Sequence, residues 1–118
     1  MFNNLGTSIE VIQDAVAHQL YERLVVQLKK DIALANISIV LPETVTPKDL
    51  KETLHEKIYY LLLERFPEYL NLLYIIDVPE KAITNITGKD IVDLAEEVTF
   101  LILRREWQKV WFKSKYSS

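Results

Sequence analysis

Apolar residues recur every three or four positions over most of this chain, which is the spacing of one face of an α-helix. The first run begins after Thr7, which forms a capping box with Glu10. The run predicts one helix from Thr7 to about Leu34 or Asn36. Its apolar arc is wide, which is typical of a helix that is central in a bundle or shared with a partner.

Threonine and proline residues mark the boundaries of two further helices. Thr46 followed by Pro47 predicts the start of the second helix. Pro67 predicts either the end of that helix or a kink near Arg65. Pro67 also suits the first turn of a third helix, and the residues at 77–80 indicate a short extra turn after it.

The segment from Ile37 to Val45 is the one irregular crossing in this pattern. It is rich in β-branched residues and contains Pro42, so it is either a connection packed against the bundle or a short strand. Two glycines and four prolines are too few for a fold built from many turns. We therefore expect an all-α protein, with one compact domain (1–118) of about four helices.

The fourth helix is predicted from about Lys89 to Phe112, and its apolar face changes direction near Leu103. Before that point the apolar residues share one side of the helical wheel, at about 100° per residue. Beyond it, the same side carries basic residues. The apolar residues of the second part lie on another side, and they are Phe100, Leu103, Trp107, Val110 and Trp111. The helix therefore contacts two environments, and the pattern does not fix whether it continues past Leu103.

The charge of the chain is unevenly distributed. Residues 104–118 hold five bases against one acid, a charge of +4, whereas the other 103 residues hold 9 bases and 16 acids, a charge of −7. Such asymmetry indicates contact with something acidic, for example a second copy of the chain.

The aromatic and basic C-terminal segment allows three interpretations. It packs on the first helix or on a second subunit, it lies on an anionic membrane, or it binds nucleic acid. We favour the first, because it also explains the wide apolar arc of the first helix. The predicted function is a non-enzymatic interaction module that forms a homo-oligomer, most simply a dimer. The predicted contact residues are Phe100, Leu103, Arg104, Arg105, Trp107, Lys109, Val110 and Trp111.

Residues suited to catalysis or metal binding are few. Glu52 and His55 have the Glu-x-x-His spacing of di-iron bundles, but the second motif that such a site needs is absent. His18 has Asp14 and Glu22 one turn away, which fits a solvated helix face better than a metal ligand or a base. An enzyme with a carboxylate–histidine pair is therefore the last of the alternatives.

Other chemical signatures are missing from the sequence. The absence of cysteine excludes thiolate chemistry and Cys-based metal sites. Gly88 follows Thr87 at a helix start, which a plain helix cap explains better than an anion site. No catalytic residue, cofactor, metal or small-molecule substrate is predicted.

The sequence also favours a cytoplasmic location. The first six residues lack the features of a signal peptide, and the apolar runs are much shorter than a membrane span. The net charge of −3 argues against general affinity for nucleic acid. We therefore expect neither a nucleic-acid partner nor a membrane partner.

Two segments resemble a group of small bacterial helical proteins without assigned activity. They are LLYIIDVPEK at 72–81 and LILRREWQKV at 101–110, and together they cover roughly the C-terminal half. The resemblance implies a small helical fold and a bacterial, cytoplasmic setting. It supplies no catalytic residues.

Overall fold

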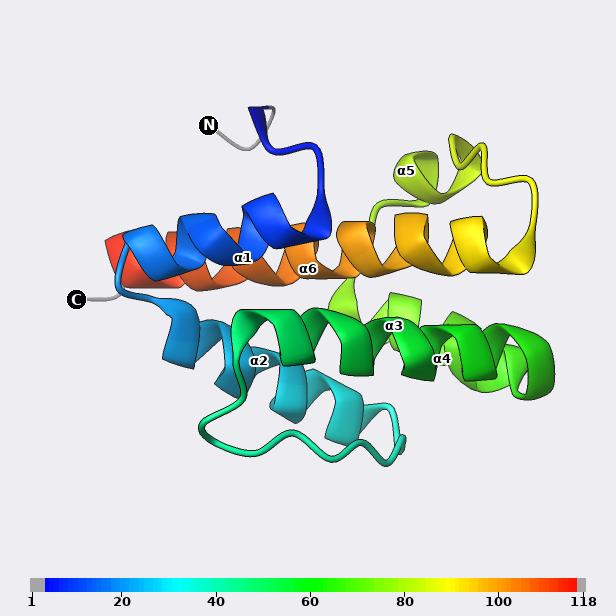
Figure 1. Cartoon of the computed structure of the whole chain (residues 1–118), viewed down its shortest axis with the longest axis horizontal. Helices are drawn as coiled ribbons and strands as arrows, with labels where there is room; N and C mark the ends of the chain where they lie inside the picture. The colour runs from blue at the N-terminus through cyan, green and yellow to red at the C-terminus, as the bar shows by residue number, and fades with distance from the viewer. Residues whose placement is uncertain (1–3, 117–118) are drawn as a thin grey trace.

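Six helices account for the regular structure of residues 4–116, which are the residues that the computed structural model describes (Figure 1). They are α1 (Ser8–Ala17), α2 (Tyr21–Leu34), α3 (Pro47–Glu64), α4 (Phe66–Ile76), α5 (Glu80–Thr84) and α6 (Ile91–Tyr116). The predicted all-α fold is confirmed. The predicted first helix is divided into α1 and α2, and the predicted extra turn is α5.

The bundle is arranged around α6, the longest helix. Its 26 residues rise about 1.5 Å each, which is enough to span the 39 Å long axis of the molecule. It contacts α1, α2, α3 and α4, with α1 beside its second half and α3 beneath it in the view of Figure 1. The helix is continuous past Leu103.

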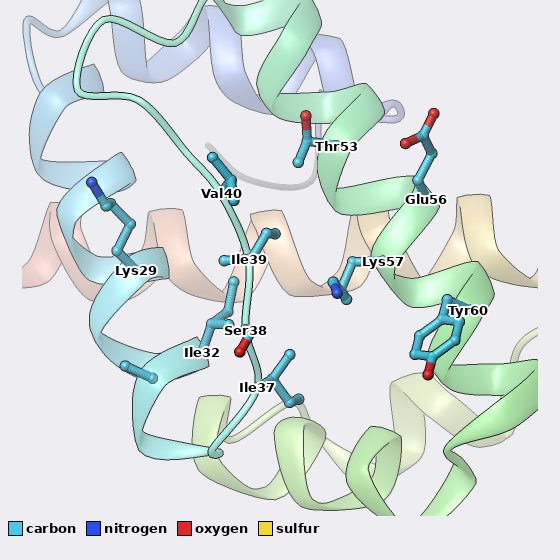
Figure 2. Close-up of a pocket in the computed structure, with 11 residues that line it drawn as sticks. Lys29, Ile32, Ile37, Ser38, Ile39, Val40, Thr53, Glu56, Lys57 and Tyr60 are labelled. Carbon is cyan, nitrogen blue, oxygen red and sulfur yellow. The ribbon is translucent and has the colours of Figure 1, made fainter.

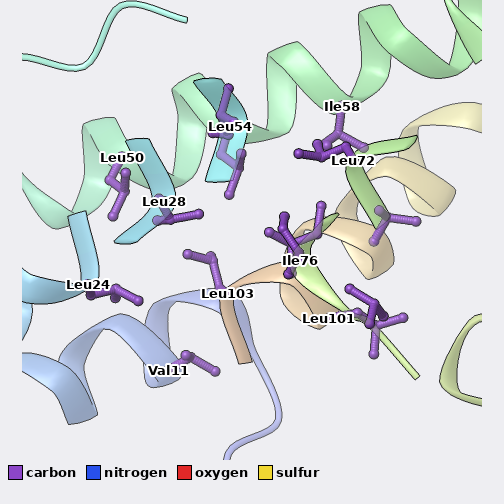
Figure 3. Close-up of a cluster of buried hydrophobic side chains, with 14 of the residues drawn as sticks. Val11, Leu24, Leu28, Leu50, Leu54, Ile58, Leu72, Ile76, Leu101 and Leu103 are labelled. Carbon is purple, nitrogen blue, oxygen red and sulfur yellow. The ribbon is translucent and has the colours of Figure 1, made fainter. Parts of the chain in front are cut away.

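A single core lies between these helices. It takes apolar side chains from α1, α2, α3, α4 and α6, so each of these helices buries one face against the others. Figure 3 shows ten of them by name, and they are Val11, Leu24, Leu28, Leu50, Leu54, Ile58, Leu72, Ile76, Leu101 and Leu103. The chain therefore has one hydrophobic core, as a single domain does.

The predicted first helix is wrong in its middle, because the chain turns at Gln19. Gln19 has a φ of 61°, and the amide of Leu20 donates a 2.9 Å hydrogen bond to the carbonyl oxygen of Ala15. This is a Schellman motif, which usually has glycine at the left-handed position. The predicted end is right, since Asn36 also has a φ of 61° and closes α2. The wide apolar arc belongs to two helices that bury different faces.

The predicted start of the second helix is confirmed, and so is the predicted boundary between the second and third helices. The hydroxyl of Thr46 accepts a 3.2 Å hydrogen bond from the amide of Asp49, and Pro47 occupies the first position of α3. The helix ends at Glu64 and α4 begins two residues later, with Pro67 in its first turn. Pro67 therefore marks the end of one helix and the start of the next.

The segment 37–45 is a connection and contains no strand. It runs across the bundle from α2 to α3 (Figure 1). Leu41 and Val45 are buried against the core, and the hydroxyl of Tyr21 donates a hydrogen bond to the carbonyl oxygen of Val45. These contacts attach the connection to α2 without a β-sheet partner.

Candidate functional site

Three of the predicted contact residues lie in the core of the chain itself. Leu103 and Trp107 are 0% exposed and Val110 is nearly as buried. The indole Nε1 of Trp107 donates a 2.9 Å hydrogen bond to a carboxylate oxygen of Asp14 in α1. The expectation that these side chains contact a second subunit is therefore corrected, since they pack on helices of their own chain.

The predicted basic contacts also have partners within the chain. Arg105 Nε donates a 2.9 Å hydrogen bond to the carbonyl oxygen of Asp77, and its Nη2 lies 3.2 Å from a carboxylate oxygen of the same residue. The guanidinium of Arg104 lies 5.1 Å from the centre of the ring of Phe100. Phe100 and Trp111 are partly buried against the core. The acids expected on a partner are thus present in the chain itself.

A buried charged cluster joins α6 to α2. Lys109 Nζ donates hydrogen bonds to Asp31 Oδ2 at 2.6 Å and to the carbonyl oxygen of Ile76 at 3.1 Å. It also lies 2.8 Å from Glu106 Oε1. Asp31 accepts a further hydrogen bond from Gln27, at 3.1 Å. Lys109 was predicted to contact a partner, but its ammonium group binds these groups of its own chain instead.

Glu106 is the member of the cluster with the most unusual ionisation. Its side chain is fully buried, and burial together with the neighbouring Asp31 raises its pKa to about 8, against the pull of Lys109. Burial opposes ionisation of Asp31 as well, but hydrogen bonds from Glu106, Lys109 and Gln27 outweigh it and lower the pKa of Asp31. The pKa of Lys109 is raised by the same two carboxyl groups, although burial opposes this.

The two carboxyl groups of this cluster have opposite pKa shifts. Burial and the neighbouring Asp31 favour a neutral Glu106, whereas Asp31 is held ionised, and both carboxyl groups lie against Lys109. Raised carboxyl pKa values also occur in active sites. Glu106 is 0% exposed, and the contacts of Lys109 with Asp31 connect α6 to α2.

The outward face of α4 is the second notable feature. Phe66, Leu70 and Tyr74 are spaced four residues apart, so they form one line along the helix. They are 51%, 51% and 82% exposed. We call these three residues the α4 stripe. The opposite face of α4 packs in the core through Tyr69, Leu72, Leu73 and Ile76. The helix is therefore apolar on both faces, and within residues 4–116 only one of them is buried.

The signal for the α4 stripe was present in the sequence. From Phe66 to Ile76 only Glu68 and Asn71 carry polar side chains that are not aromatic. A helix that is apolar all round is normally buried on all sides. The sequence pattern of this helix therefore does not show which of its faces is buried.

The two histidines lie apart from both features. His18 caps α1, where its Nδ1 lies 2.8 Å from the carbonyl oxygen of Asp14. His55 faces α6, and its Nε2 lies 3.8 Å from a carboxylate oxygen of Glu96. Each histidine thus has a local structural contact. Over residues 4–116, no three side chains of the His, Asp and Glu types are grouped as a metal site requires.

A shallow groove of about 770 Å³ lies between α2, the connection and α3. Figure 2 shows Ile37 and Ile39 on the connection between the two helices, with Lys29 on the α2 side and Glu56 on the α3 side. The polar groups of a specific small-molecule site converge on one point. Lys29 and Glu56 do not converge in this way, because they lie on opposite sides of the groove.

The fold and its surfaces define an all-α protein in which α4 carries an exposed apolar face. No family model matches the chain, and neither a curated protein nor a solved structure matches it. The resemblance of segments 72–81 and 101–110, with the bacterial and cytoplasmic setting it implies, stays a prediction. Among the described residues, none of the helices combines the length and apolar character needed to cross a bilayer.

Proposed function

We propose that this protein is a non-enzymatic helical interaction module and that the α4 stripe is its docking surface. The observation that carries the proposal is the exposure of Phe66, Leu70 and Tyr74 along one line of a helix. Apolar lines with this four-residue spacing are the anchors of helix-in-groove and helix-pairing contacts. Exposed apolar patches of this kind mark interaction sites on soluble proteins.

The proposal moves the expected contact from α6 to α4. Leu103, Trp107 and Val110 would have to leave the core to reach a partner, at a cost comparable to the stability of a whole domain. The α4 stripe needs no rearrangement. Self-association, predicted from the sequence for the last helix, is retained as a proposal and assigned to α4.

A charge placed on the α4 stripe tests the docking surface. Leu70→Glu is expected to leave the unfolding midpoint in urea nearly unchanged, because the side chain is half exposed. The substitution is expected to abolish association. Association of the wild type is detected as a mass above 13.8 kDa in light scattering, or as a partner that is cross-linked to the protein in an extract of the cells that make it. Glutamate is costly in a desolvated apolar contact.

Val26→Glu is the matched control, since Val26 is 65% exposed on a different helix, α2. This variant should associate as the wild type does. Two results would contradict the proposal: a wild-type chain with neither a raised mass nor a cross-linked partner, or a Leu70→Glu variant that keeps every association.

The end of α6 supports a second candidate, binding to an anionic membrane surface. The rings of Phe112 and Tyr116 stack 6.0 Å apart and both are exposed, while Lys115 lies over the ring of Trp111. Exposed aromatic and basic residues on one helix end favour contact with lipid headgroups.

This candidate predicts that the chain sediments with anionic vesicles at low salt. Binding should weaken as salt is added, because the attraction is between charges that salt screens. Lys115→Gln should weaken the binding and Lys48→Gln, a lysine at the start of α3, should not. A chain that stays in the supernatant at low salt removes this candidate.

A further inference from the structure

We propose that a groove between α2 and the end of α6 binds an anionic amphiphile, that is, a carboxylate or phosphate group joined to an apolar chain. The groove measures about 500 Å³, which is within the range of small-molecule sites. The described residues that line it come from α2 and α6, two helices that pack on each other. The groove is therefore separate from the α4 stripe.

Positive charge gathers around this groove. Arg23 and Lys30 line it from α2 and Lys113 lines it from α6, whereas Glu22 is the one acid among the described residues of its lining. Arg23 and Lys30 are seven positions apart, which is about two helical turns, so they share one face of α2. The whole chain has a net charge of −3. The groove is thus a basic site on an acidic protein, and such a site attracts anions.

Two of these bases are available to a ligand. Arg23 and Lys30 are both exposed, and neither forms an ion pair within residues 4–116. Lys109 differs from them, because its ammonium group is taken up by Asp31 and Glu106. A guanidinium binds carboxylate and phosphate groups through two parallel hydrogen bonds, and an ammonium adds a point charge. Arg23 and Lys30 are therefore suited to hold an anionic headgroup.

Part of the lining is apolar, which is why the ligand is an amphiphile rather than a bare anion. Val26 and Val110 line the same groove as the bases, and Val26 is 65% exposed. The methylene stems of arginine and lysine add further apolar surface. An inorganic anion would leave Val26 uncovered. An apolar chain next to the headgroup would remove this surface from water.

The walls of the groove are held together by the contacts between the two helices. Gln27 lines the groove, and its Nε2 donates a 3.1 Å hydrogen bond to Asp31. Asp31 in turn accepts a 2.6 Å hydrogen bond from Lys109 of α6. The groove is therefore formed by two packed helices, without a loop in its described lining, as is usual for a site that exists before its ligand binds.

Calorimetric titration with three probes tests the ligand class. Decanoate, kept below the concentration at which it forms micelles, is the amphiphile. Inorganic phosphate is the anion without a chain, and decanol is the chain without a charge. The wild type should bind decanoate, and each of the other two probes should bind at least about tenfold more weakly, because each lacks one of the two contacts. Added salt should weaken the binding of decanoate.

Substitutions place the binding in the groove. Arg23→Gln and Lys30→Gln should each weaken the binding of decanoate about fivefold, since each removes one partly solvated charge contact. Lys48→Gln is the matched control, because it removes the same charge from an exposed position on α3, and it should bind as the wild type does. Val26→Glu places an acid in the groove and should abolish the binding.

Three results would overturn the proposal. The first is a wild-type chain that does not bind decanoate at low salt. The second is binding of phosphate or decanol as tight as that of decanoate. The third is a loss in Lys48→Gln as large as that in Arg23→Gln, which would show attraction to net charge alone.

Anionic vesicles distinguish the two sources of such an amphiphile. If Arg23→Gln weakens binding to vesicles and to decanoate in the same proportion, the ligand is a lipid headgroup in a bilayer. If it weakens binding to decanoate alone, the ligand is a free amphiphile. Either result supports the groove as the site.

The groove and the α4 stripe are tested by opposite variants. Leu70→Glu, which is expected to lose association, should bind decanoate as the wild type does. Val26→Glu should lose decanoate and keep association. Equal loss of decanoate binding in Leu70→Glu would overturn the assignment of the ligand to the groove, whereas the docking surface is decided by association alone.

Discussion

Alanine in place of Trp107 is expected to lower the free energy of unfolding by about 3–5 kcal/mol. The side chain is 0% exposed and is among the largest of the fully buried ones. Its removal leaves a cavity between α1 and α6 and deprives Asp14 of the 2.9 Å hydrogen bond from the indole. Urea denaturation followed by circular dichroism measures the change.

Two variants separate the parts of this effect. Trp107→Phe keeps most of the apolar volume and loses the N–H donor, so its cost should be smaller, about 1–3 kcal/mol. Trp111→Ala removes a side chain that is only partly buried and should cost less than Trp107→Ala. An unchanged midpoint in Trp107→Ala, or a larger loss in Trp111→Ala, would contradict the core position of Trp107.

Glutamine in place of Glu106 is expected to remove a loss of stability that the wild type shows as the pH rises. In the folded chain the pKa of Glu106 is about 8, above its usual value of 4.5. Between these values the folded state holds a proton that the unfolded state has released. Rising pH therefore favours unfolding. The stability that the protonated Glu106 contributes is fully present only below about pH 4.5 and is lost as the pH rises to about 8.

The other members of the cluster do not titrate in that window. The pKa of Asp31 is lowered, so the stability that the ionised Asp31 contributes is lost only at acid pH, below the usual aspartate pKa of 3.8. The pKa of Lys109 is raised, so the stability that the charged Lys109 contributes is lost only above the usual lysine pKa of 10.5. From about pH 5 to about pH 8, Glu106 is thus the one group of the cluster that changes.

The measurement is the difference in unfolding free energy between Glu106→Gln and the wild type as a function of pH. Glutamine resembles the neutral acid, so the difference should move in favour of the variant by roughly 3 kcal/mol between about pH 5 and about pH 8.5. Glu22→Gln, at an exposed position, should show no such trend. A difference that stays constant across this range would show that Glu106 does not bind the proton.

Local signals in the sequence were sufficient for most helix boundaries. Thr46 and Pro47 specify a helix start through groups that act within one turn, and Pro67 separates two helices for the same reason. Asn36 is a common residue for the left-handed position that ends a helix. Gln19 is not, and nothing near it in the sequence marks the break between α1 and α2.

The sites depend on contacts between distant parts of the chain, which a single sequence does not reveal. Glu106 was counted as the lone acid of a basic tail, whereas it is buried beside Asp31 of α2. The change of direction of the apolar face on the last helix was visible in the sequence. Of its two interpretations, packing within the chain or on a second subunit, packing within the chain holds for Trp107. An apolar side chain has the same appearance in a core and in an interface, so the pattern alone could not choose.

The late position of α6 in the chain has a consequence for synthesis. Every helix that α6 contacts comes before it in the sequence, and the hydrogen bond between Trp107 and Asp14 joins residues 93 positions apart. While the chain is being made, the parts of α1 and α3 that pack on α6 stay uncovered until α6 has emerged from the ribosome. A nascent chain that stalls before α6 exposes these faces to aggregation and to chaperones.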